Sequence, residues 1–498
     1  MANTPFIFSI IPFVLFLFLL FWRKISLLKT SGITLILITT LAIFYWQIIP
    51  SFLLVSYAKG FFVALDIFII IVGAIFFLEV LRDFNVIENI THYLESFSKD
   101  YRVQVILLAW FFENLLEGTA GFGVPGAIIA PILVGLGFHP VKSVIIALLG
   151  NSTAGIFGAA GTPIRVGFAG LNVSSIPHIA SLINFVGIIV PIFILWVLVA
   201  DKKNKKQEFL ECLPFAIWSG VIFAITSYLS VPLGQEFPSI VGSIVALIII
   251  FISVRLNIFM PRTSRTFKDE KVILPKNMSL LKTFSPYILL IVLLIIGKFL
   301  LSPINYQIPF GINHNFNLFN PGFAFIITGI LISIFWKHKK EIVFHATKDA
   351  IKRAVAPFFI IVCMSAIVQV MINSGQNFSG FSSSIMLIAQ NFETELLPFW
   401  SPFIGAFGAF LTGSITISNI MFGNFLNIAA QALNFSAEKI LSLALVGAAA
   451  GNMVALADIL AAESVLKLKH KEQEVIRGVI VPCLIYVALV GFIGMLIL

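Results

Sequence analysis

Charged residues are scarce in this chain of 498 residues. Lys, Arg, Asp and Glu together make up only 11% of it, whereas 59% of the residues are hydrophobic. A soluble globular domain usually carries about a quarter of its residues as charges. Apolar runs of about twenty residues recur from end to end, and each is long enough to cross the hydrocarbon of a bilayer as a helix. The sequence therefore predicts an all-α polytopic membrane protein.

Cysteine and the common catalytic motifs are also scarce. The three cysteines, Cys212, Cys363 and Cys483, lie in apolar runs and have no CxxC spacing, which argues against a disulfide framework and against a metal site. The seven histidines form no HExxH pair, and no GxxxxGK[ST] motif occurs, so the signatures of a zinc protease and of a P-loop ATPase are missing. We therefore predict a protein that is not an enzyme and that needs no cofactor or metal.

The net charge of +9 is unevenly distributed. Basic residues form short clusters between apolar runs, at Arg23 and Lys24 and in the loops 201–206, 255–282 and 337–353. Such clusters mark cytoplasmic loops more simply than they mark a nucleic-acid partner. Counting spans against these loops predicts twelve transmembrane helices, with both termini outside and lipid around them.

The stretch 113–168, ENLLEGTAGFGVPGAIIAPILVGLGFHPVKSVIIALLGNSTAGIFGAAGTPIRVGF, combines an apolar background with two glutamates, an arginine and many glycines. An ionisable group at mid-membrane costs on the order of 2.5 to 3.5 kcal/mol on insertion scales. Glycine and proline also free backbone groups that lipid cannot satisfy. Broken helices with buried charge therefore indicate a site.

Two apolar pieces, 103–116 and 127–138, flank the break in this stretch. At ~1.5 Å per residue the second is too short to cross the hydrocarbon alone, so we predict a re-entrant hairpin entering from the cytoplasm and then a broken span at 141–166. A second hairpin, turning at 412–414, and a second broken span at 440–466 repeat the pattern from outside. Oppositely oriented hairpins in inverted repeats are typical of secondary transporters with a site at the midplane.

This pattern divides the chain into four regions: N-terminal helices at 1–102, a first transport region at 103–200, central helices and cytoplasmic loops at 201–353, and a second transport region at 354–498. The central helices are interpreted as scaffold. Lys298 is the charged residue within their spans, and its long side chain can extend to the polar end of its helix. Asp66, inside the third span, fits a structural carboxylate and a site residue equally well.

Four acidic residues near the breaks are candidates for proton coupling. Glu113 and Glu117 stand four residues apart on one helical face, where two carboxylates in a low-dielectric site cannot easily both ionise. One of them should hold its proton more tightly than a free carboxylate does. For Glu117 the alternative is a structural carboxylate satisfied by backbone N–H groups of the glycine turn. Asp458 and Glu463, in the second broken span, are the next candidates.

An organic anion also needs hydrogen-bond donors. The turns at 118–121 and 412–414 would place half-helix N-termini near the membrane centre. Arg165 can bind a carboxylate through two parallel hydrogen bonds, although a salt bridge to Glu117 or Asp458 explains this residue equally well. The candidate substrate-binding residues are Gly118, Thr119, Gly121, Asn151, Thr162, Arg165, Thr412, Ser414, Thr416, Ser418 and Asn419. A single Ser or Thr in a membrane helix more often forms an interhelical hydrogen bond than a ligand contact, so it is their density at both breaks that indicates a site.

The segments EGTAGFGVPGAIIAPILVGLGFHP, FGAAGTPI and PFIGAFGAFLTGSITISNIMFG resemble the signatures of the L-lactate permease family. The similarity continues more weakly through ALDIFIIIVGAIFF, QVMINSGQN and GNMVALAD, so it covers both halves of the chain. The resemblance implies a symporter of the bacterial cytoplasmic membrane that couples protons to lactate, glycolate and similar 2-hydroxy monocarboxylates.

Three departures from the family pattern concern the site. Ile415 stands where the family tends to have Asp or Asn, Asn452 stands in place of Lys in a Gly-Lys-Met motif, and Arg165, Asp458 and Glu463 are additional charges. These changes leave other cargoes open, namely a dicarboxylate or a sulfonate, and sodium as the coupling ion. An anion channel is less favoured, because polarity is confined to the two breaks.

Overall fold

The computed structural model of the chain describes residues 4–22, 25–121, 123–266, 278–308, 315–336, 340–391, 394–468 and 470–498. Over these residues the chain is helical apart from loops and a short antiparallel pair, β1 (Asn305–Gln307) and β2 (Asn315–Asn317). Nine described helices are long and apolar enough to cross a membrane, or ten when the bent pair Pro140–Gly150 and Thr153–Arg165 counts as one span. The predicted all-α polytopic fold is confirmed.

Two of the twelve predicted spans are shorter than the others. The apolar helices Thr4–Leu20 and Pro321–Phe335 fall below the 18 residues of a full candidate span. Parts of three predicted basic loops, namely residues 23–24, 267–277 and 337–339, lie outside the described residues. The sidedness of the membrane, which depends on these loops, stays a prediction.

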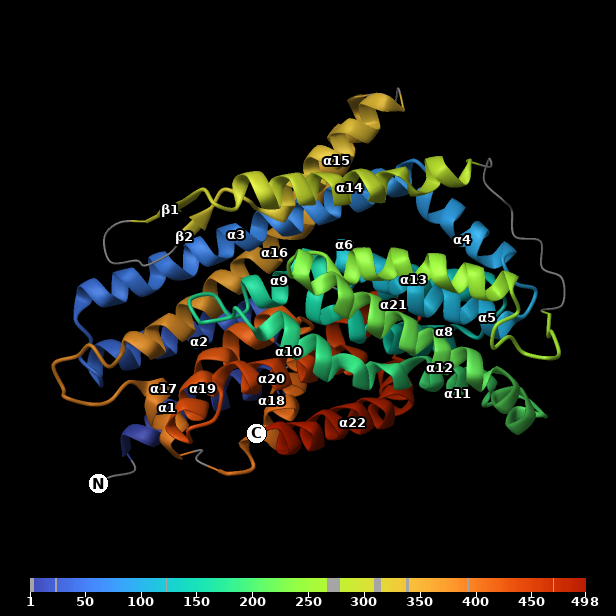
Figure 1. The fold of residues 1–498 in the computed structure, drawn as a ribbon. Coiled ribbons are helices and arrows are strands. Elements are labelled where there is room, and N and C mark those ends of the chain that lie inside the picture. Colours follow the sequence, from blue (N-terminus) through green and yellow to red (C-terminus); the bar gives the residue numbers. More distant parts are fainter. Residues whose placement is uncertain are drawn as a thin grey trace.

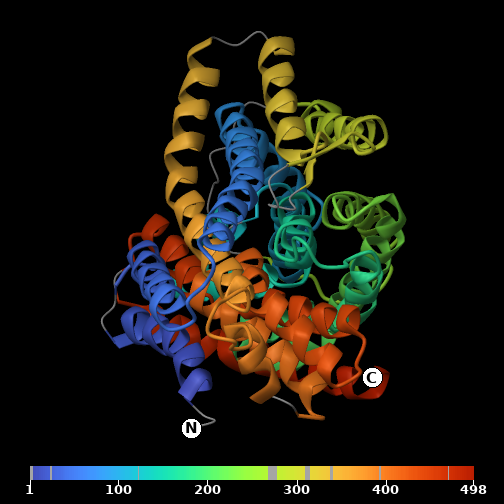
Figure 2. The same ribbon diagram turned by 90° about the vertical axis from the view of Figure 1, so that its left-hand side faces the viewer.

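The N-terminal helices pack on helices from the middle of the chain (Figures 1 and 2). A Cβ added to Gly60 would lie 2.8 Å from the backbone nitrogen of Ala366, so α3 (Pro50–Asp83) and α16 (Lys340–Asn373) are in backbone contact there. Small residues at such contacts are typical of membrane helix pairs. Figure 2 shows α3 between α15 and α16. These helices are α1 (Thr4–Leu17), the π-helical η1 (Phe18–Trp22), α2 (Leu27–Phe44), α3 (Pro50–Asp83), α4 (Val86–Ser96), α15 (Pro321–Phe335) and α16 (Lys340–Asn373).

The prediction of a loop up to residue 353 is wrong, because α16 is one unbroken helix from Lys340. Charged residues in its first half form ion pairs, both within α16 and with the neighbouring helix α3. His345 lies 3.7 Å from Asp349 at i,i+4, and Arg353 contacts Glu79 of α3 at 2.9 Å. Good helix formers and side-chain pairs of this spacing extend a helix beyond its apolar span.

Each transport region consists of a hairpin followed by a broken span. The first contains α5 (Tyr101–Ile106), the π-helical η2 (Leu107–Phe112), α6 (Glu113–Thr119), α7 (Val124–Gly135), α8 (Pro140–Gly150), η3 (Thr153–Phe157), α9 (Gly158–Arg165), α10 (Ile176–Ile183), η4 (Asn184–Ile189) and α11 (Val190–Val199). The second contains α17 (Ser384–Asn391), α18 (Leu397–Thr412), α19 (Ile415–Ala432), α20 (Ala437–Gly451), η6 (Asn452–Val454), α21 (Leu456–Val465) and α22 (Glu472–Ile497). The central helices are α12 (Lys205–Ser230), η5 (Val231–Leu233), α13 (Pro238–Arg255) and α14 (Leu280–Leu301).

The two hairpins begin at opposite ends of the molecule. Helix α22 starts beside the first hairpin, where Glu474 and Arg477 line a groove with His139 and Lys142. This helix of 26 residues ends beside the second hairpin, where a Cβ on Gly494 would lie 2.6 Å from the carbonyl of Pro398. Figure 1 shows α5 at the right of the fold, and α22 running from the right toward the C-terminus at the lower middle. The hairpins therefore approach the interior from opposite ends, as the sequence predicts.

A buried ionic cluster fixes the foot of the first hairpin. Arg102 is fully buried and contacts Asp100 at 2.7 Å and Glu211 of α12 at 3.2 Å. It also donates to the carbonyls of Glu208, at 2.8 Å, and Thr263, at 2.9 Å. The cluster therefore attaches the hairpin to α12 and to the loop after α13.

We expect Arg102→Leu to be strongly destabilising. Removing one partner of a buried ion pair leaves an uncompensated charge, here on Asp100, and typically costs about 3 to 5 kcal/mol. The matched control is Lys471→Leu, because the Lys471–Glu474 pair is half exposed and such pairs contribute about 0 to 1 kcal/mol. Thermal unfolding of the purified variants in detergent measures the difference, and equal melting temperatures would contradict the assigned role.

Candidate functional site

The two hairpin tips and the two breaks meet in the interior at one small cavity, which we call the central cavity. Its volume is about 20 Å³, enough for about one water molecule. It is lined by Glu117 and Gly121 of the first tip, Gly413, Ser414, Ile415 and Thr416 of the second tip, Gly158, Ala159, Thr162 and Pro163 of the first break, and Asn452 of the second break. Residues about 300 positions apart along the chain thus share one cavity.

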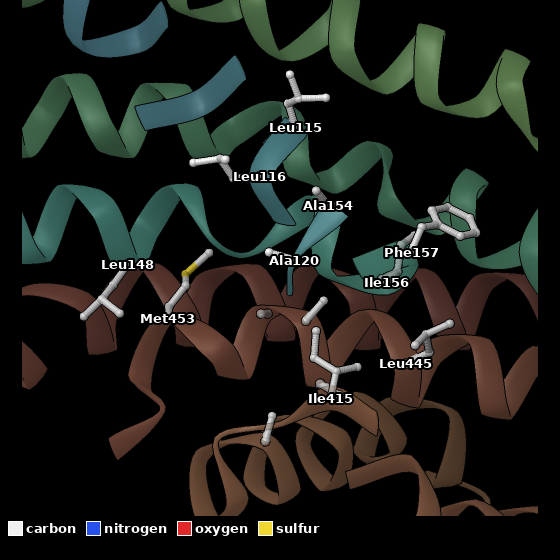
Figure 3. Packing of buried hydrophobic residues seen from close by; sticks show 14 of the residues in the cluster. Leu115, Leu116, Ala120, Leu148, Ala154, Ile156, Phe157, Ile415, Leu445 and Met453 are labelled. Carbon is white, nitrogen blue, oxygen red and sulfur yellow. The ribbon is translucent and has the colours of Figure 1, made fainter. Parts of the chain in front are cut away.

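Buried apolar side chains from the same elements pack closely together (Figure 3). Ala120, Ile156, Ile415 and Met453 come from the first tip, the first break, the second tip and the second break, and all are buried. A Cβ added to Gly155 would lie 2.5 Å from Cδ1 of Ile415. A small organic acid is larger than the central cavity, so these elements must move apart before it can enter.

The first break has an unusual backbone. Ala159 (φ 42°, ψ 57°), Ala160 (φ 52°, ψ 49°) and Gly161 (φ 78°, ψ 14°) are three consecutive left-handed residues. For each alanine this conformation costs about 1 to 2 kcal/mol, so the surrounding packing must hold the turn in place. The Thr162 hydroxyl contributes by donating to the carbonyl of Ala159 at 2.6 Å.

Glu117 supplies the carboxyl group of the central cavity. Glu117 is 3% exposed, and a Cβ added to Gly158 would lie 2.5 Å from the Oε1 atom of Glu117. Within the described residues Oε2 has no hydrogen-bond partner, and no Lys, Arg or His forms an ion pair with Glu117. The predicted alternative, a carboxylate satisfied by backbone N–H groups, is therefore not what the side-chain contacts show.

Two further buried carboxyl groups interact electrostatically with Glu117, namely Glu113 and Asp458. Glu113 lies one turn earlier on α6, and its Oε2 would lie 2.5 Å from a Cβ added to Gly150. Asp458 packs against Gly123, next to the first tip. Both Glu113 oxygens and Oδ2 of Asp458 lack a hydrogen-bond partner in the described part of the chain. Three candidate acids are thus brought together.

The other two charged candidates lie elsewhere. Glu463 interacts electrostatically with Glu472 and His470 at the start of α22. Arg165 donates from Nη2 to the carbonyl of Phe319 at 2.6 Å, and its guanidinium lies 5.8 Å from the centre of that ring. Among the described residues, neither of the carboxylates considered from the sequence forms an ion pair with Arg165.

Several polar candidates stabilise the hairpins rather than line the cavity. Thr119 donates to the carbonyls of its own helix, at residues 115 and 116, and Thr412 donates to the carbonyl of Gly408 at 2.8 Å. Ser418 joins the arms of the second hairpin by donating to the carbonyl of Gly405 at 2.8 Å. Gly118 permits close packing on Ser239 of α13.

Two asparagines among the candidates lie next to the first break. Asn419 donates to the carbonyl of Pro163 at 3.0 Å and so links the second hairpin to α9. Asn151 ends α8 and is 1% exposed, and neither atom of its amide has a hydrogen-bond partner within the described residues. Of the eleven predicted substrate-binding residues, those on the central cavity are Gly121, Thr162, Ser414 and Thr416.

Two supporting residues are missed by the sequence analysis. Asn184 donates to the carbonyl of Thr153 at 2.9 Å, and the Tyr486 hydroxyl donates to Asn184 Oδ1 at 2.7 Å. This buried chain holds the first break against α22. Its members stand alone in separate apolar runs, so no local pattern identifies them. By contrast, the glycines of GAAGTP identify Gly158 and its neighbours as a break.

Comparison with known proteins agrees with this architecture. The family model described as L-lactate permease matches residues 5–311 and 300–498. A putative L-lactate permease of Haemophilus influenzae is 30% identical, over 84% of this chain and 84% of its own length. Glycolate permease GlcA of Escherichia coli is 28% identical over 98% of this chain and 94% of its own. The L-lactate permease of Bacillus subtilis is 26% identical over 98% and 95%, respectively.

The contact between Glu117 and Gly158 predicts a specific coupling. Gly158→Ala should lower thermal stability by about 1 to 3 kcal/mol, because the new methyl group collides with the carboxyl group in a packed interior. Combining it with Glu117→Ala should remove most of that penalty, which a double-mutant cycle measures. Gly135→Ala is the control, since no atom lies within 4 Å of its added Cβ. An equal penalty with and without Glu117 would disprove the contact.

Proposed function

Because this chain belongs to the L-lactate permease family, we propose that it takes up a small 2-hydroxy monocarboxylate, such as lactate or glycolate, by symport with a proton. Family membership and the apolar helices make it a multi-pass membrane transporter and not an enzyme. The names of the relatives, which include both lactate and glycolate permeases, support the substrate class.

One observation carries the proton-coupling proposal: Glu117 lies in the cavity where both hairpins meet, buried with two further carboxyl groups and without an ion pair in the described part of the chain. Leaving an isolated carboxylate ionised in such surroundings costs so much that the group binds a proton instead. Glu117 is therefore neutral in this closed conformation. It releases the proton when the cavity opens to water.

The same electrostatics couples the proton to the anion. Two negative charges about 4 Å apart repel by about 4 kcal/mol at an effective dielectric constant of about 20, the value that best describes protein sites. A carboxylate therefore enters the central cavity favourably only when Glu117 is protonated. The pair of anion and proton is neutral, so it crosses the membrane without moving net charge.

The second hairpin supplies donors for the anion. Helix α19 begins at Ile415, and Ser414 caps it by accepting from the N–H of Ile417 at 3.3 Å. The N–H groups of Ile415 and Thr416 have no partner within the helix, and the positive end of the helix dipole adds to their attraction for an anion. Asn452 also lines the cavity. Neutral donors therefore replace the Lys and the polar residue of the family pattern.

Glu117→Gln should uncouple transport. The amide mimics the protonated acid, so uptake of lactate or glycolate against a gradient, driven by a pH difference across proteoliposomes, should fall to background while exchange of labelled substrate survives. Glu463→Gln, whose carboxyl group lies away from the cavity, is the matched control and should keep the coupling. All assays use sodium-free buffer.

Two results would contradict this proposal. Accumulation by Glu117→Gln with the wild-type pH dependence would place the proton elsewhere. If the wild type transports the acid only when sodium is present, the coupling ion is sodium and not a proton.

A further inference from the structure

A second and larger cavity, which we call the basic pocket, lies at the other end of α9. Its volume is about 380 Å³. It is lined by Lys59, Val63, Asp66, Arg165, Val166, Ala169, Gly170, Gln235, Glu236, Lys298, Ser302, Asn305, Asn317 and Phe319. Gly158, Ala159, Thr162 and Pro163 border the central cavity, whereas Arg165 and Val166 border this one. One short helix thus separates the two spaces.

Charge in the basic pocket favours an anion. Among the residues that the structure describes, three basic and two acidic side chains line it. Lys298 contacts both carboxylate oxygens of Glu236, at 2.9 and 3.1 Å, so these two charges compensate each other. Arg165 interacts electrostatically with Asp66, yet in the described chain it forms no ion pair within 4.0 Å. Lys59 forms none there either, which leaves an excess of one positive charge.

Arg165 has donors to offer. A guanidinium carries five N–H donors, and the hydrogen bond described for Arg165 uses Nη2 on the carbonyl of Phe319. That bond and the cation–π contact with the Phe319 ring orient the planar group. An oriented guanidinium matches the two oxygens of a carboxylate.

Size separates the roles of the two cavities. Pockets that bind small molecules usually measure about 300 to 1,000 Å³, and the basic pocket falls within that range whereas the central cavity holds about one water molecule. The basic pocket reaches the surface at Gly170 and Asn305, which are exposed. In this conformation the basic pocket is large enough for a hydroxy acid from solution, whereas the central cavity is not.

The pocket lies at the end of the molecule opposite the Arg102 cluster. Helix α12, of 26 residues, starts beside that cluster and ends shortly before Glu236, and Lys298 lies in the last turn of α14. The distribution of basic loops predicts that this end faces outside. Between the two cavities the left-handed Gly161 lies against Gln235, whose carbonyl would be 2.5 Å from a Cβ added there.

We propose that the basic pocket is an external loading site, in which Arg165, supported by Lys59, binds the carboxylate of the transported acid before the acid passes α9 to the central cavity. This inference rests on the proposed function. It makes Arg165 a specificity residue for anions on one side of the membrane, whereas Glu117 serves both sides.

Sided kinetics of Arg165→Gln tests the loading site. In right-side-out vesicles the KM for external lactate or glycolate should rise about tenfold or more, since a charge-assisted carboxylate contact is lost, with little change in Vmax. In inside-out vesicles the KM should stay near the wild-type value. Arg165→Lys should restore part of the external affinity, and Lys59→Gln should raise the external KM less. Lys439→Gln is the matched control, because it removes an exposed cation that contacts the C-terminal helix.

These measurements distinguish a failure of the loading-site proposal from a failure of the proposed function. A wild type that transports neither acid would refute the proposed function itself. Normal wild-type transport combined with an unchanged external KM in Arg165→Gln refutes the loading site alone. An equal rise in KM on both sides would assign Arg165 to the shared site, and a fall in Vmax alone would make its role structural. If Arg165→Gln does not fold, Lys59→Gln carries the test, and an unchanged external KM in it counts against the proposal.

Discussion

Lipid offers no hydrogen-bond partner to an interrupted helix, and this constraint determines the centre of the molecule. Four interruptions, two at hairpin tips and two in spans, cannot face the bilayer, so they must satisfy one another inside the protein. Asn419 of the second hairpin donates to the carbonyl of Pro163 in the first break, and Asp458 of the second broken span packs against Gly123 of the first hairpin. Each repeat thus completes the other. Where the interruptions meet, they enclose Glu117.

Helix α9 connects the chemistry of this centre to the surface. Its first residues border the central cavity, its last border the basic pocket, and its entry is the strained turn at Ala159 and Ala160. Strain of this kind persists where neighbouring packing outweighs it.

Much of this arrangement follows from the sequence because its signals are local. Glycine, proline and carboxylates inside apolar runs identify both hairpins, both breaks and Glu117. The orientation of the Arg165 side chain cannot be predicted from the sequence, since it depends on how three consecutive left-handed residues rotate α9. The basic pocket is equally hidden, because Lys59 and Lys298 are single charges in separate helices that only the tertiary fold brings together. Helix α16 extends beyond its apolar span for a related reason: its charged half gains a partner on α3.

Binding of the anion between the hairpin tips is tested most directly by substrate protection of a cysteine at Ile415. The variant Ile415→Cys is made in a background without the three native cysteines, and its alkylation by a small hydrophilic thiol reagent is timed with and without lactate or glycolate. Bound anion should slow the reaction, and slow it more at lower pH, where Glu117 is protonated. A cysteine at the exposed Glu395 should react at the same rate throughout. If saturating anion leaves the rate at residue 415 unchanged at every pH, the anion does not bind between the hairpin tips.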